Sequence, residues 1–73
     1  METELTPQGI GRAIQIARQR QKLTQAELAA AAGVGKRFVV ELEAGKPTVQ
    51  LGKALQVAAA AGLEVTLTVR AAQ

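Results

Sequence analysis

The chain has 73 residues, of which 48% are hydrophobic, and its nine Lys and Arg against six Glu give a formal net charge of +3. Ser, Asp, Asn, His, Cys, Tyr and Trp are absent, which excludes a catalytic triad, a Cys nucleophile, a His general base, a disulfide and the usual zinc site. No Glu lies beside a second catalytic group or a Gly-rich phosphate loop, so we expect neither enzyme activity nor a cofactor. A chain this short predicts one domain, residues 1–73, that needs tight helix packing or oligomerisation for stability.

The basic residues are concentrated in the middle of the chain. Between residues 12 and 53, eight Lys and Arg oppose three Glu. This surplus suits a polyanionic partner, although a solvated helical surface would look similar. The N-terminus carries Glu2 and Glu4 instead of a basic region followed by an apolar run, so no secretory signal is predicted. With no segment long enough to span a membrane, we expect a cytoplasmic protein.

Two helices are predicted in the first half of the chain. The first covers residues 7–21, with Thr6 as its N-cap, a proline at its first position and an apolar face that includes Ile14. The second covers residues 25–32. Thr24 and Glu27 have the spacing of a capping box, and Gly33 is the expected stop.

The stretch "VGKRFVVELEAGK" is ambiguous by propensity, because it contains the strand formers Phe, Val and Val. A hairpin with residues 63–70 is one alternative. Val39 and Leu42 are three residues apart, however, and Gly45 is a natural stop, so a helix over 36–44 is favoured.

A fourth helix is predicted over residues 49–61, with Thr48 as its N-cap and with Leu51, Leu55 and Ala58 on its apolar face. Gly52 inside it is expected to cost about 1 kcal/mol relative to Ala unless a neighbouring backbone approaches closely there.

The segment "LEVTLTVR" predicts a β-strand over residues 63–70, because apolar and polar residues alternate along it. A strand needs a hydrogen-bonding partner. Because "RFVVEL" is assigned to a helix, the remaining source of a partner strand is the same segment of a second copy, paired antiparallel across a two-fold axis. The apolar residues expected to form this dimer contact are Leu63, Val65, Leu67 and Val69.

The two short central helices, joined by a tight turn around "AGVG", have the layout of a helix-turn-helix DNA reader. The stretch "LTQAELAAAAGVGKRFVVELEAGK", residues 23–46, resembles the XRE, or Cro/CI-type, repressor motif. More narrowly, the "TP" that opens the first helix and "KRFVVELEAGKPTVQLGKAL" resemble HipB-like antitoxins. The resemblance covers residues 6–62. It implies a mainly α, four-helix domain with one C-terminal strand, acting as a dimeric repressor of its own operon and binding a HipA-type serine/threonine kinase toxin.

Residue roles follow from the resemblance, position by position. Gln25 is expected to contact a phosphate from the second helix, and Lys36 and Arg37 to lead the recognition helix into the major groove. Val40 against a thymine methyl and Glu41 against cytosine N4 are expected as further base contacts. The remaining expected roles are phosphate contacts for Lys46 and Thr48 and a structural ion pair between Arg18 and Glu43.

One departure from the motif is Gly35, where a Ser or Thr often caps the third helix. A capping side chain is lost there, and with it a candidate phosphate contact. Arg12, Arg20, Lys22 and Lys53 are interpreted as solvated surface rather than DNA contacts. Two alternatives to the antitoxin remain open, a stand-alone regulator without a toxin and a protein-binding adaptor that does not bind DNA.

Overall fold

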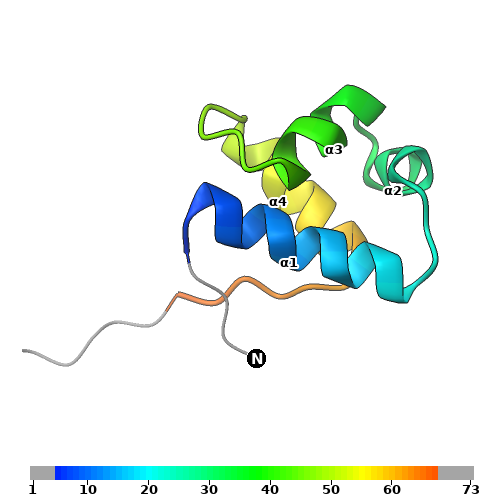
Figure 1. The fold of residues 1–73 in the computed structure, drawn as a ribbon, viewed down its shortest axis with the longest axis horizontal. Coiled ribbons are helices and arrows are strands. Elements are labelled where there is room, and N and C mark those ends of the chain that lie inside the picture. The colour runs from blue at the N-terminus through cyan, green and yellow to red at the C-terminus, as the bar shows by residue number, and fades with distance from the viewer. Residues whose placement is uncertain (1–4, 68–73) are drawn as a thin grey trace, which may run out of the picture.

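The computed structural model describes residues 5–67, which fold into helices packed around one small core. The helices are α1 (Pro7–Arg20), α2 (Gln25–Ala32), α3 (Lys36–Glu43) and α4 (Leu51–Ala60). In Figure 1, α2 and α3 form an angled pair above α1, and α4 runs behind α1. The prediction of a mainly α fold is confirmed, and the ends of α1, α2 and α3 lie within one residue of the predicted ones. Within residues 5–67, no helix combines the length and apolar character needed to cross a membrane.

Each helix contributes one large, fully buried side chain to the core: Ile14, Leu28, Val39 and Val57. Val39 is buried together with Leu42, three residues later on the same helix. That spacing matches one face of a helix, so the hairpin alternative for this segment is wrong. Burying a side chain of this size contributes about 1.5 to 3 kcal/mol, and four of them account for much of what holds so small a domain together.

The predicted caps of the first two helices are present. Thr6 Oγ1 accepts a hydrogen bond from the Gly9 amide at 2.9 Å. At the start of α2, Thr24 Oγ1 accepts from the Glu27 amide at 3.0 Å, and the Thr24 amide donates to Glu27 Oε1 at 2.8 Å. The third helix begins after Gly35 without any side-chain cap. Both helix starts that carry a capping Thr were therefore readable from local sequence.

The predicted start of α4 is wrong, and of its predicted apolar face only Ala58 is buried. The helix begins at Leu51 after Gln50, so Thr48 is not its cap and lies in the preceding turn. Val49 packs against the core, and this holds Gln50 in an extended conformation, with φ of −68° and ψ of 123°. The helix therefore begins at Leu51, two residues later than predicted.

The buried side of α4 is formed by small residues instead of leucines. Ala54, Val57 and Ala58 are buried, whereas Leu51 and Leu55 are 69% and 45% exposed. Alanines at these positions allow α4 to lie close to α2, which a pair of leucines would prevent.

The predicted C-terminal strand is not present where the structure describes this segment. Residues 63–67 have no strand hydrogen bonding, and residues 68–70 lie outside the described residues. Leu63 packs against the core, but Val65 and Leu67 are 52% and 83% exposed and do not cover the helices. The physical reason is that one chain alone offers residues 63–67 no neighbouring strand with which to pair.

Close backbone packing occurs at Gly11 in α1 instead of at Gly52. A Cβ added at Gly11 would overlap the carbonyl oxygen of Leu42 and lie 3.0 Å from that of Glu43, whereas one added at Gly52 would meet nothing within 4 Å. The absence of a side chain at Gly11 therefore lets α1 lie directly against the end of α3.

We expect Gly11→Ala to destabilise the fold by about 3 kcal/mol, because the clash is with backbone atoms that move only if α1 and α3 separate. The matched variant Gly52→Ala changes the same atoms in open space and should stabilise by up to about 1 kcal/mol. Urea unfolding of the two variants measures both effects. Equal stability of the two would contradict the close contact between α1 and α3.

Candidate nucleic-acid interface

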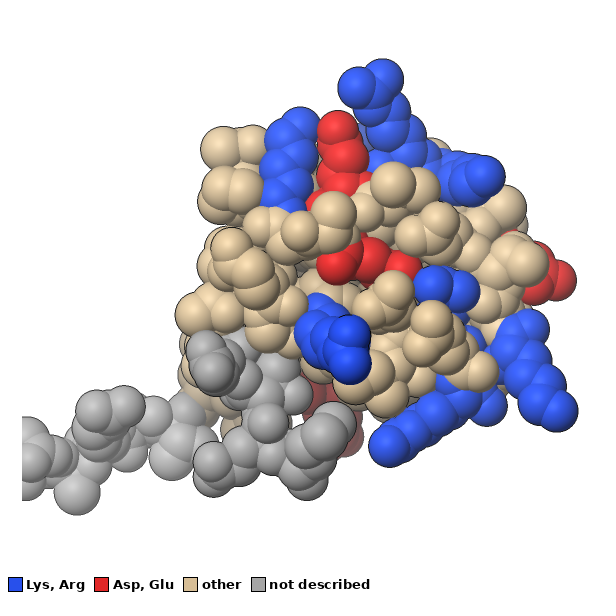
Figure 2. All heavy atoms as spheres, viewed as in Figure 1, with Lys and Arg blue, Asp and Glu red and all other residues tan. Residues whose placement is uncertain are grey.

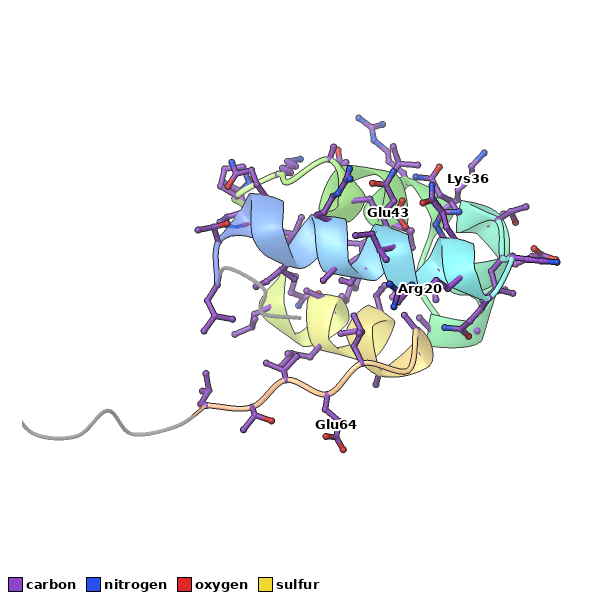
Figure 3. All side chains as sticks on the ribbon, turned by 60° about the horizontal axis from the view of Figure 1, so that its bottom comes forward. Arg20, Lys36, Glu43 and Glu64 are labelled. Atoms are coloured by element: carbon purple, nitrogen blue, oxygen red, sulfur yellow. The ribbon has the colours of Figure 1, made fainter. Side chains whose placement is uncertain are left out.

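A partly buried polar network joins the end of α1, the start of α2 and the end of α3. Arg18 donates from Nε to Glu43 Oε2 at 2.7 Å and from Nη2 to Glu43 Oε1 at 3.0 Å. Its Nη1 donates to the Leu23 carbonyl oxygen at 2.8 Å. Figure 3 shows Glu43 between α1 and α3. The ion pair implied by the resemblance is thus present in the structure, and in a two-pronged geometry that favours a single orientation.

Both partners of this ion pair are shielded from water. The side chains of Arg18 and Glu43 are 11% and 3% exposed. The hydrogen bond to Glu43 raises the pKa of the Arg18 guanidinium above its usual value, so the group is charged at any physiological pH. A buried pair of this kind contributes through geometry more than through net stability. Its main effect here is to hold the end of α1 against the end of α3.

Gln25 belongs to the same network. Its Nε2 donates to Glu43 Oε1 at 3.1 Å, so the first side chain of α2 is tied to the last residue of α3. The sequence interpretation gave Gln25 only a phosphate contact and missed this bond. The available signal was the Arg18–Glu43 pairing itself, because a carboxylate that binds Arg through both oxygens still has lone pairs for a further donor.

The outward side of α3 carries the residues expected to contact bases. Lys36 and Arg37 begin the helix, and Val40, which is 39% exposed, follows one turn after Lys36. Figure 3 shows Lys36 on the outer edge, across α1 from Arg20. The first turn of α3 contains no acidic residue. Two cations at a helix N-terminus oppose the helix dipole, so their placement is not explained by helix stability.

Glu41 lies between two of the cations expected to contact DNA. Its Oε2 accepts from Lys46 Nζ at 3.2 Å and lies 3.5 Å from Arg37 Nε. The hydrogen bond from Lys46, together with the charge of Arg37, holds the pKa of the Glu41 carboxyl below its usual value. The carboxylate is therefore ionised at neutral pH. The structure brings Arg37, Glu41 and Lys46 together.

The other predicted contacts lie around this surface. Thr48 lies in the loop between α3 and α4, and no side-chain hydrogen bond ties it to the residues of the described part. Lys53, interpreted as solvated surface, has its Nζ 6.0 Å from the centroid of the half-buried Phe38 ring. In Figure 2, basic side chains flank an acidic one over α3, and further basic side chains gather near the end of α1. Among residues 5–67, no group of three or more His, Cys, Asp or Glu side chains is arranged so that it could hold a metal ion.

Comparison with known proteins assigns the family. The family model HTH_3, described as helix-turn-helix, matches residues 14–67. The chain is 53% identical over 62 residues to an uncharacterized HTH-type transcriptional regulator, y4mF, of Sinorhizobium fredii (strain NBRC 101917 / NGR234), a match that covers 85% of this chain and 82% of that protein.

Solved structures share the same fold. A chain of a HipB–O4 20mer complex superposes with a TM-score of 0.84 at 22% identity, covering 94% of this chain and 97% of that chain. A HipA–HipB–O2–O3 complex gives the same values, and a HipB(S29A)–O2 20mer complex gives a TM-score of 0.84 at 23% identity, covering 94% of this chain and 96% of that chain. These likenesses show a HipB-like arrangement of helices. With the family match over most of its length, the chain belongs to the XRE-type helix-turn-helix family of transcriptional regulators.

Proposed function

We propose that this chain is a cytoplasmic homodimeric repressor, which binds operator DNA through α3 and is the antitoxin of a HipA-type kinase module. The observation that carries the DNA-binding part is that Lys36, Arg37 and Val40 are exposed, with Glu41 partly exposed beside them, on a helix whose position is fixed by the Arg18–Glu43 pair. A recognition helix needs both features, because side chains reach base edges correctly only from a rigid support.

The proposed contacts divide into base and phosphate contacts. From the first turn of α3, Lys36 and Arg37 reach into the major groove, where Arg can bond bidentately to the O6 and N7 of guanine. Gln25 uses one N–H of its amide for Glu43. The other N–H remains for a phosphate, and the capped start of α2 adds its positive dipole end. Lys46 and Thr48, in the loop after α3, contact phosphates of the DNA backbone.

The proposed homodimer uses the C-terminal segment. Leu63, Val65, Leu67 and Val69 pair with the same residues of a second copy in a two-stranded antiparallel ribbon. The exposure of Val65 and Leu67, two residues apart in this segment, supports this proposal, because large apolar side chains exposed close together often mark an interaction surface. Val69 lies outside the described residues.

The antitoxin part of the proposal rests on the resemblance of residues 36–55 to HipB-like proteins and on the HipB-like fold, including its likeness to a chain of a HipA–HipB–O2–O3 complex. A second candidate is a stand-alone regulator with no toxin. The relative that is 53% identical is described as a transcriptional regulator, which fits this candidate as well. The two candidates share every DNA contact and differ in whether a kinase gene lies beside this one.

Purification of the protein from its native cells, followed by mass spectrometry, tests the partner. Footprinting upstream of its own coding region tests the operator. The antitoxin proposal expects a co-purifying kinase and a protected site. A protected site without a kinase would replace it with the stand-alone regulator, and no protected site would remove autoregulation altogether.

A further inference from the structure

Glu41 is an acidic residue on a surface proposed to approach a polyanion, and the fold does not need it there. We infer that Glu41 determines DNA-sequence specificity in two ways. It pairs with Arg37 and Lys46 in the free protein, and it weakens binding to DNA sequences that place no hydrogen-bond donor in front of it. This inference rests on the proposed function and deepens it, because it concerns which DNA sequences the same face of α3 binds weakly.

The first step of the argument is geometric. A single oxygen, Oε2 of Glu41, lies 3.2 Å from Lys46 Nζ and 3.5 Å from Arg37 Nε. The two cations come from opposite sides of Glu41, one from a helical turn earlier and one from the loop after α3. One carboxylate therefore pairs with two of the three basic side chains expected to contact DNA.

The second step concerns how easily those bonds exchange. The side chains of Arg37 and Lys46 are 91% and 46% exposed. Exposed ion pairs of this kind are weak, so a phosphate or a guanine can take either cation from Glu41. Pairing to Glu41 thus reduces the free energy released by each DNA contact without blocking it.

The third step concerns the carboxylate after the exchange. When α3 enters the groove, Glu41 keeps its charge, loses water and faces a field of phosphates. An ionised group that loses water without finding a donor is unfavourable. The N4 amino group of cytosine is a suitable donor in the major groove. Glu41 therefore costs little binding free energy on sequences that place such a donor in front of it, and it weakens binding to other sequences. A repulsive element of this kind produces specificity.

The other acidic residue of α3 shows that this role is particular to Glu41. Glu43 is buried, bound to Arg18 and Gln25, and needed for the arrangement of the helices. Glu41 is half-buried at most and bonds only to exposed cations among the described residues. Its replacement by Gln should therefore leave the fold intact and change only the charge of the DNA-facing surface.

The test compares Glu41→Gln with the wild type on two DNAs, a duplex that the wild type selects from a randomised pool and sonicated calf-thymus DNA. We expect the variant to bind calf-thymus DNA about fivefold more tightly, with a salt slope steeper by about 0.9 for each additional phosphate that it neutralises. Its affinity for the selected duplex should not rise, so the ratio of the two Kd values falls about fivefold.

Glu64→Gln is the matched control, because it makes the same charge change far from α3 (Figure 3). An equal tightening of both DNAs by Glu41→Gln, of the size that Glu64→Gln gives, would overturn the inference and leave the proposed function standing. Failure of the wild type to select any sequence would instead remove the proposed function and this inference with it.

Discussion

Replacement of Lys36 and Arg37 together by Ala is expected to abolish operator binding while the protein stays folded and dimeric. A good base contact is worth about 1 to 3 kcal/mol, so loss of both leading contacts should weaken binding by about 100-fold or more. Both side chains are exposed, and neither contributes to the core, so the free energy of unfolding should not change. Fluorescence anisotropy on the footprinted operator, at constant salt, measures the loss.

The control for this variant is Arg12→Ala with Arg20→Ala, which removes the same charge from α1. Figure 3 places Arg20 across α1 from Lys36. We expect the control to lose less than about tenfold, through general electrostatics alone. Retained binding by the Lys36 and Arg37 double variant would remove α3 as the recognition helix and favour a protein-binding adaptor.

Truncation after Gly62 is expected to give a monomer or a much weaker dimer, with operator affinity reduced accordingly. The truncation removes the segment proposed to pair across the dimer together with its apolar side chains, of which Val65 and Leu67 are exposed in the single chain. Two half-sites bound by separate monomers lose the increase in effective concentration that a dimer provides. Sedimentation equilibrium, with operator binding on the same samples, measures both quantities.

The truncation also removes Leu63, which packs against the core, so a second variant separates dimer loss from unfolding. Val65→Glu with Leu67→Glu changes only side chains that are exposed in one chain and should dissociate the dimer without lowering monomer stability. Thr66→Glu, on the alternate side of the segment, is its control. A truncated protein that remains fully dimeric would refute the role of this segment.

Local sequence features were enough to predict α1, α2 and α3. The Thr6 cap, the box formed by Thr24 and Glu27, and the spacing of Val39 and Leu42 all act over a few residues, so each was visible without knowledge of the fold. The same holds for the position of Lys36 at the start of α3.

Features that depend on distant residues could not be predicted in this way. The start of α4 is set by the packing of Val49, and its buried face by the nearness of α2. The close contact at Gly11 depends on backbone atoms of Leu42 and Glu43, which lie far away along the chain. The bond between Gln25 and Glu43 likewise exists only after α2 and α3 pack.

The C-terminal segment is a different case, because its proposed strand needs a second copy of the chain. Alternation of apolar and polar residues predicts a strand only if a partner strand is present. Residues 63–67 have no partner strand among the described residues of one chain, and the proposed second copy would supply one.

Selection of duplexes from a randomised pool by the wild-type protein tests most directly the claim that a dimer reads DNA with α3. Two recognition helices related by a two-fold axis lie about 34 Å apart, or one turn of DNA. The selected sequences should therefore form an inverted repeat whose half-sites are about 10 base pairs apart, centre to centre. Enrichment of a single unrepeated site, or of no sequence at all, would contradict the claim.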